Sequence, residues 1–360
     1  MSGRHYSVIV GTGSYLPTRR VPNDHFLQNE FYNTAGERLK NSNEETIRKF
    51  RDITGIAERR YVTDDLKASD IAALAARNAL ESSGIDPESL DNIIVAHNFG
   101  DVRADNRRSD FVPSLAARVK HKLAIANPKT IACDLPFGCP GWLQGMIQAD
   151  HSIQSGDCKR AMVIGAETLS RISDPHDRDS MIYADGAGAT ILEARESDRP
   201  IGILAHAVRS DMLAHAYMLW MGRSNDPNHK GDELYLKMDG HRLYEYALKT
   251  VPLVVKESMD KAGVAIGDVK KVLIHQANEK MDEAILRRLF KLCGAGAMPP
   301  HIMPMTISWL GNSSVATLPT LLDLLVKGKM EEHEWAKGAI IAFASVGAGM
   351  NINSVIYKIA

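Results

Sequence analysis

Three side chains in this sequence belong to types that take part in acyl-transfer chemistry: the thiol of Cys139, the imidazole of His275 and the amide of Asn312. Cys139 lies in the segment FGCPG, directly before a stretch whose apolar residues recur at helical spacing. A helix N-terminus stabilises a thiolate, so we expect a lowered thiol pKa, with Pro140 in the first helical position. Taken alone, however, a cysteine in an apolar context is more often structural than reactive.

The other two residues are equally ambiguous when each is taken alone. His275 follows the apolar run KVLI and so lies at the carboxyl end of a predicted strand, where the active sites of α/β sheets gather. A lone histidine is nevertheless more often a simple structural group. Asn312 precedes a helical stretch and by itself predicts a helix cap. Their meaning depends on the elements that bring them together.

These elements occur twice in the chain. Gly84 and Gly263, 179 residues apart (263 − 84), each end a helical stretch that leads through a polar turn to a buried strand. The Cys139 turn corresponds in the same way to the Asn312 turn. A Gly-Ala-Gly segment closes each copy, at 186–188 and at 347–349. Three markers in one order indicate an internal duplication.

We therefore predict two similar α/β halves, residues 1–195 with Cys139 and residues 196–360 with His275 and Asn312, that meet at the site. Continuous apolar strands indicate sheets covered by helices on both faces. The stretch 200–233 has weak periodicity, and we expect it to form loops over the substrate entrance.

Composition excludes several classes of protein. The 360 residues carry a formal net charge of −1 at pH 7, so no overall field favours nucleic acid or an anionic membrane. No apolar run reaches the ~20 residues that span a bilayer, and the N-terminal residues show no signal pattern. We therefore expect a cytoplasmic protein. We also expect no bound metal, because the cysteines have neither C-x-x-C nor zinc spacing. The cysteines other than Cys139 are interpreted as structural thiols, namely Cys133, Cys158 and Cys293.

Together these residues resemble β-ketoacyl-acyl carrier protein synthase III of the thiolase superfamily. The similar segments run nearly end to end and include GTGSYLP at 11–17, TGIAERRY at 54–61, ASDIAALAARNAL at 68–80, FGCPGW around Cys139, SDPHDR at 173–178, DGAGATIL at 185–192, HQAN at 275–278 and GNSSVAT at 311–317. The resemblance implies a thiolase-like, duplicated, five-layered α/β/α/β/α fold and a homodimer.

The resemblance also implies the roles of the three residues. Cys139 would accept an acyl group from a primer thioester. His275 and Asn312 would bind the thioester carbonyl of a malonyl-type extender and stabilise the enolate left by departing carbon dioxide. The backbone N–H groups of Cys139 and Gly349 would form the oxyanion hole. No cofactor is implied, since the substrates are thioesters of coenzyme A or phosphopantetheine.

The chain departs from the family where coenzyme A binds. The family often has an aromatic residue and an arginine just before TGI, whereas this chain has Lys49 and Ile53. Arg178, another coenzyme A contact of the family, is retained, and Asn278 of HQAN is assigned to substrate binding. A primer bound to acyl carrier protein therefore becomes a reasonable expectation.

Two further sites follow from the resemblance. Lys280, Arg287 and the adjacent Arg288 match the family's docking site for the acidic carrier protein, although a solvated helix face explains the charges equally well. Val112, beside Phe111, matches the residue that closes the partner subunit's acyl pocket. A valine there is small, so we expect medium or longer primers to be preferred over acetyl.

Other activities remain open. A thiolase is disfavoured because its second cysteine near the terminal glycine run is missing. A type III polyketide synthase shares the Cys, His and Asn, and a non-decarboxylative acyltransferase would also use Cys139. A non-catalytic partner subunit would usually have lost one of the three groups.

Overall fold

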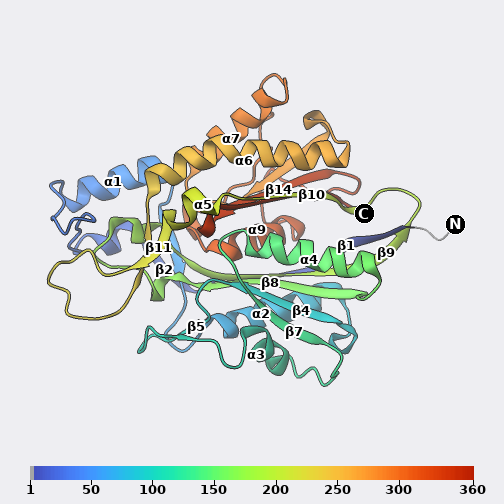
Figure 1. The fold of residues 1–360 in the computed structure, drawn as a ribbon, viewed down its shortest axis with the longest axis horizontal. Coiled ribbons are helices and arrows are strands. Elements are labelled where there is room, and N and C mark those ends of the chain that lie inside the picture. Colours follow the sequence, from blue (N-terminus) through green and yellow to red (C-terminus); the bar gives the residue numbers. More distant parts are fainter. Residues whose placement is uncertain (1–3) are drawn as a thin grey trace.

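The computed structural model describes residues 4–360, and its backbone is organised around two sheets (Figure 1). The first sheet has the strand order β1 (Arg4–Tyr15), β9 (Asp185–Ser197), β8 (Arg160–Thr168), β4 (Asn92–His97), β7 (Ile131–Pro136). The second has the order β10 (Gly202–Ser210), β15 (Asn351–Lys358), β14 (Ile340–Gly347), β13 (Val269–Ile274).

The two sheets repeat one pairing pattern. β9 pairs antiparallel with β1 and β8, and β4 runs parallel to β8. In the second sheet β15 pairs antiparallel with β10 and β14, and β13 runs parallel to β14. The predicted boundary at 195/196 falls inside β9. The expectation of loops throughout 200–233 is wrong in its first part, because β10 is a nine-residue strand on the edge of the second sheet.

Helices cover both faces of both sheets, which confirms the predicted five-layered α/β/α/β/α fold (Figure 1). One outer layer contains α2 (Ala68–Ser83) and α3 (Leu115–Lys122). The central layer contains α4 (Gly141–Ser155) and α9 (Thr317–Val326), and the other outer layer contains α6 (Gly240–Ala262) and α7 (Glu279–Leu292).

Of the two central helices, α9 is mostly apolar and buried on nearly every side, whereas α4 leaves Gln148 and His151 exposed on one side. A helix that is apolar all round must be buried. In α9 only the last residue, Val326, is not fully buried. The central cluster joins Trp142 and Leu143 of α4 to Leu321 of α9 and to Phe343 of β14. The start of α4, where Cys139 lies, is thereby fixed between the two halves.

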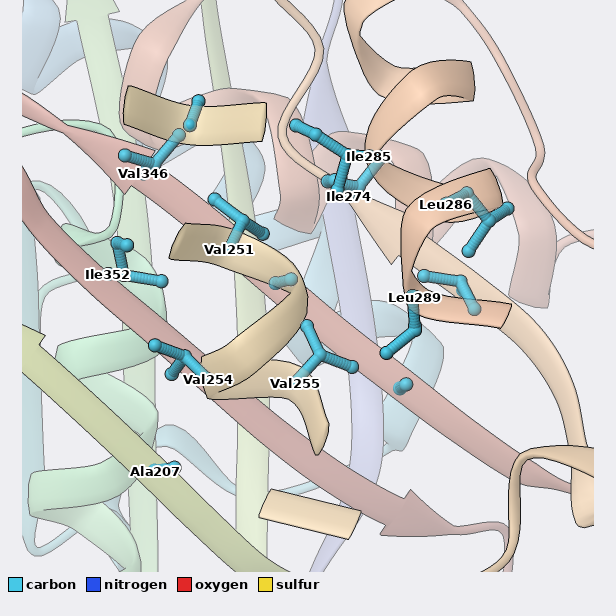
Figure 2. Packing of buried hydrophobic residues seen from close by; sticks show 14 of the residues in the cluster. Ala207, Val251, Val254, Val255, Ile274, Ile285, Leu286, Leu289, Val346 and Ile352 are labelled. Atoms are coloured by element: carbon cyan, nitrogen blue, oxygen red, sulfur yellow. The ribbon is translucent and has the colours of Figure 1, made fainter. Parts of the chain in front are cut away.

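The outer helices bury one face each. In Figure 2, Val251, Val254 and Val255 of α6 and Leu289 of α7 pack over the strands of the second sheet. The glycine stops that the repeat predicted have the same conformation in both halves: Gly84 ends α2 and Gly263 ends α6, both with φ +66°, a left-handed conformation that suits glycine.

Shorter elements gather at the end of the sheets away from both termini (Figure 1). They comprise the helices α1 (Asn43–Thr54), α5 (Met212–His215) and α8 (Ile307–Leu310) and three two-stranded sheets. The small sheets pair β2 (Arg19–Pro22) with β3 (Glu58–Tyr61), β5 (Asp101–Val102) with β6 (Ser109–Asp110), and β11 (Leu219–Gly222) with β12 (Tyr235–Met238). None of the helices within residues 4–360 combines the length and the apolar character needed to cross a membrane.

Candidate active site

The cysteine turn joins the carboxyl end of β7 to α4. The helix begins at Gly141, and Pro140 lies just before it, so the prediction of Pro140 as the first helical residue is off by one position. The backbone of 347–348 packs against this turn without room for a side chain. A Cβ on Gly347 would lie 2.6 Å from the Cys139 nitrogen, and one on Gly138 would lie 2.6 Å from the Ala348 nitrogen.

Cys139, His275 and Asn312 line one apolar pocket, although they come from three segments far apart in the sequence. Two of these residues are brought to the pocket by strands: β7 leads to Cys139, and β13 ends immediately before His275. Apolar side chains form most of the wall, among them Leu169, Leu219, Leu236, Met238, Leu243 and Val346. Such a wall excludes water from a reacting thioester.

His275 is held as a neutral imidazole. Its backbone N–H donates to the Ala344 carbonyl at 2.9 Å, and the residue is 4 % exposed. Burial lowers the pKa of His275 to about 4, so the ring is uncharged at neutral pH. Within residues 4–360 its Nδ1 has no hydrogen-bond partner. The tautomer of the neutral ring that carries its proton on Nε2 can donate to a substrate oxygen.

Asn312 is fixed by its backbone and by one side of its amide. Its N–H donates to the Ile182 carbonyl at 3.0 Å, and its carbonyl accepts from Ala184 at 2.8 Å. Its Oδ1 accepts the Ser314 N–H at 2.8 Å. The amide oxygen is therefore engaged, which leaves the Nδ2 group as a donor for a ligand in the pocket.

The environment of the Cys139 thiol differs from the expectation of a lowered pKa. Burial raises the pKa of Cys139 to about 11, while the Ser314 hydroxyl, which donates to Sγ at 3.3 Å, acts in the opposite direction. The helix-start position was visible in the sequence, but the position of the half-buried thiol in an apolar pocket was not. Cys158 is buried, and Cys133 is exposed.

The sequence analysis missed three polar residues that line the pocket, Asn98, Tyr183 and Ser314, and also Glu167, which is hydrogen-bonded to Asn98. Asn98 directly follows β4, and Glu167 lies at the end of the neighbouring parallel strand β8. Polar residues at the carboxyl ends of buried strands were the available signal. Burial raises the pKa of Glu167 to about 7. The Tyr183 hydroxyl is buried without a partner in the described part of the chain.

A second, larger cavity lies beside the pocket. This cleft has a volume of about 1100 Å³ and shares part of its wall with the pocket, namely Met238, Leu243, Ala277, Met281 and Asn312. Arg178 and Asn278 line it, as do the divergent Lys49 and Ile53. The sequence analysis missed Trp220, an aromatic residue of the same wall. The cleft thus lies directly beside the pocket that Cys139 lines.

The remaining predicted residues lie outside both cavities. Lys280, Arg287 and Arg288 are exposed on α7, and Arg287 pairs with Glu283 at 3.4 Å. Phe111 and Val112 are 45 % and 85 % exposed. Gly349 does not line the pocket, whereas its neighbours Gly347 and Ala348 do. Over residues 4–360 no group of three or more His, Cys, Asp or Glu side chains is placed to hold a metal ion.

A duplicated thiolase-like fold with a cysteine, a histidine and an asparagine on one pocket defines a condensing enzyme that transfers acyl groups. Residues 133–212 match the family model for 3-oxoacyl-(acyl carrier protein) synthase III, and residues 259–359 match the model for its C-terminal part. The chain belongs to this family and is an acyl-transferring condensing enzyme of fatty acid, polyketide or related lipid synthesis.

Solved structures agree with this assignment. The synthase III of Aquifex aeolicus is 27 % identical with a TM-score of 0.79, over 98 % of this chain and 99 % of that one. The synthase III of Thermus thermophilus is 26 % identical with a TM-score of 0.80, over the same shares. The priming β-ketosynthase of the R1128 polyketide pathway is 25 % identical with a TM-score of 0.79, over 100 % of this chain and 98 % of that one.

Proposed function

We propose that this enzyme condenses an acyl primer with a malonyl-type extender by decarboxylation, through an acyl-thioester on Cys139. The supporting observation is that the half-buried thiol of Cys139, the neutral imidazole of His275 and the free amide donor of Asn312 line one apolar pocket. The loss of carbon dioxide from the extender generates the attacking carbanion, so the proposed reaction needs no resident cofactor.

The reaction divides into two half-reactions at one site. In the first, the Cys139 sulfur attacks the primer thioester and the carrier thiol leaves with a proton. In the second, Nε2 of His275 and Nδ2 of Asn312 donate to the carbonyl oxygen of the extender thioester. Carbon dioxide departs, the enolate oxygen keeps both hydrogen bonds, and the carbanion attacks the acyl group on Cys139. A neutral imidazole suits this role because it donates without needing to be charged.

We assign the second oxyanion donor to the N–H of Ala348 rather than to that of Gly349. Ala348 lines the pocket and its nitrogen lies against Gly138, beside the nucleophile. A Cβ on Gly349 would instead contact Asn351 and Met212. The Cys139 N–H at the start of α4 supplies the first donor.

Carrier-protein thioesters are the proposed substrates. The cleft presents the carboxyl groups of Asp177 and Asp179 beside Arg178, whose guanidinium lies 3.7 Å from Asp179. Acidic groups disfavour the phosphates of a coenzyme A nucleotide. The exposed Lys280, Arg287 and Arg288 follow Asn278 and offer an acidic carrier protein a basic surface at the cleft mouth.

We further propose a cytoplasmic homodimer in which the exposed Val112, with Phe111 beside it, meets the acyl pocket of the second subunit. The pocket of the single chain has a volume of only about 50 Å³, so room for a long primer would have to form where the two chains meet. A small valine leaves more space there than an aromatic residue would, which is the basis for proposing medium or longer primers.

The two half-reactions can be tested separately. Release of carbon dioxide from malonyl-carrier protein and acylation by acyl donors should both be measured in Cys139→Ala, His275→Ala and Asn312→Ala, with Ser313→Ala as a buried control. Cys139→Ala should abolish acylation. His275→Ala and Asn312→Ala should lower decarboxylation by ~10²-fold or more while acylation is largely kept. Normal decarboxylation in His275→Ala and Asn312→Ala would reject the proposed roles.

A further inference from the structure

A row of hydrogen bonds leads from Cys139 along the wall of the pocket, where Asn98 and Ser314 lie, to the buried Glu167. The Ser314 hydroxyl donates to the Cys139 sulfur at 3.3 Å. Nδ2 of Asn98 donates to the same hydroxyl at 3.1 Å and also to Oε1 of Glu167. The Asn98 backbone N–H donates to that carboxylate oxygen too, at 2.6 Å. The row joins residues 98, 139, 167 and 314 of the chain.

The direction of every bond in this row is fixed. Oε1 of Glu167 accepts the Asn98 backbone N–H and is therefore an acceptor, so it faces the NH₂ side of the Asn98 amide. That amide then points its second hydrogen at the Ser314 oxygen. With its oxygen occupied as an acceptor, the Ser314 hydroxyl turns its own hydrogen toward the sulfur. The sulfur of Cys139 thereby receives a donor that could not be predicted from its place at a helix start.

The backbone of Ser314 supports a special role for its side chain. Its φ of +53° lies in the left-handed region, where a residue other than glycine is strained. The Oδ1 of Asn312 accepts the Ser314 N–H at 2.8 Å and holds this conformation. The same asparagine that offers its amide to the pocket therefore also sets the serine that contacts the nucleophile.

We propose that Ser314 is a catalytic hydrogen-bond donor to the Cys139 thiolate and that Asn98 and Glu167 are positioning residues that aim it. The inference rests on the proposed use of Cys139 as nucleophile. Ser314 stabilises the thiolate during acylation and again when the sulfur leaves at the end of condensation. Glu167 acts through its acceptor oxygen, since its negative charge opposes the thiolate.

The test is the pH profile of Cys139 alkylation, which requires no substrate. The intact protein is treated with iodoacetamide between pH 6 and 11, and the alkylation rate of the Cys139 peptide is followed by mass spectrometry; below the thiol pKa this rate is proportional to the thiolate fraction and so reports a change in the pKa. Ser314→Ala should raise the thiol pKa by roughly one unit, a tenfold loss of thiolate at a given pH. Asn98→Leu should produce a comparable rise, and the double variant should add little to either.

Three further variants complete the test. Ser314→Gly removes the hydroxyl but accepts a positive φ, so it keeps the test open if Ser314→Ala does not fold. Ser313→Ala is the matched control, because that buried hydroxyl contacts Thr317 rather than the sulfur and should leave the pKa unchanged. Glu167→Gln keeps an acceptor and removes a charge that raises the Cys139 pKa, so the pKa should fall.

An unchanged thiol pKa in Ser314→Gly, or in Asn98→Leu, overturns the proposal. A rise in Glu167→Gln also contradicts it, because removing a negative charge beside the thiol while keeping an acceptor oxygen should only lower the thiol pKa. Since alkylation is independent of turnover, either result leaves the proposed condensation standing. An absence of condensation in the unaltered enzyme would in turn leave the alkylation result standing.

Discussion

Gly347 offers the sharpest test of how tightly the cysteine turn is held. Its φ of −168° is an extended conformation open to any residue, so alanine adds no backbone strain there. The added Cβ would nevertheless lie 2.6 Å from the Cys139 nitrogen, 2.8 Å from Cδ of Pro140 and 2.9 Å from Cβ of Cys139. Since nonbonded carbon atoms prefer about 3.5–4 Å, the nucleophile or its oxyanion donor must move by roughly 1 Å.

A displacement of about 1 Å at a reacting centre can cost on the order of 10²-fold in rate. We therefore expect Gly347→Ala to lower the rate of Cys139 acylation by about that factor, measured by intact mass over time. Gly267→Ala is the matched control, because no atom lies within 4 Å of its added Cβ. Thermal melts of both variants show that each is folded. Wild-type acylation in a folded Gly347→Ala enzyme would refute the packing argument.

Three other outcomes are expected. Val112→Phe should shift primer preference toward acetyl in kcat/KM, and preference of the unaltered enzyme for acetyl over octanoyl donors would contradict the pocket argument. Charge reversal at Lys280 and Arg287 should raise the KM for malonyl-carrier protein at low salt. Lys129→Glu, an exposed lysine before β7, is the control, and an unchanged KM in the α7 variant argues against docking on α7. Asp282→Leu should raise the melting temperature, because the Asp282 carboxyl is buried with neither oxygen bonded within residues 4–360, at a cost of ~1–3 kcal/mol.

The Asp282 effect has a pH dependence of known sign. Burial raises the pKa of this carboxyl well above its normal value, with Glu279 adding to the rise. The folded state therefore holds the proton more tightly than the unfolded state, and stability falls as pH rises above the normal aspartate pKa. The gain in melting temperature from Asp282→Leu should be larger at pH 7 than at pH 4, and an equal gain at both would contradict the argument.

The sequence was sufficient for the parts of this molecule that repeat. The stops at Gly84 and Gly263, the paired turns and the buried strands each depend on a local pattern, and together they predicted the layered fold. β10 was missed because no marker of the repeat falls in it and because edge strands carry mixed polar residues such as His206 and Arg209. The hydrophobic pattern that identifies a strand is weak in an edge strand, which has no pairing partner along one side.

Tertiary packing decides what the sequence could not predict about the site. Asn98, Glu167 and Ser314 meet only because two neighbouring strands of one half end beside a turn of the other. The raised pKa of Cys139 follows from burial by both halves, which the local sequence does not reveal. The proposed oxyanion donor is Ala348 instead of Gly349, the neighbouring residue in the same tight turn. Sequence similarity alone does not distinguish two adjacent backbone N–H groups.

The central claim is that Cys139 carries the acyl group. The most direct measurement is peptide mapping by mass spectrometry after brief incubation of the intact enzyme with a panel of acyl-carrier-protein and acyl-coenzyme A donors. The account predicts one acyl group per chain on the Cys139 peptide, and none on Cys139→Ala under the same conditions. An acyl group on Cys133, Cys158 or Cys293 with Cys139 unmodified would contradict it.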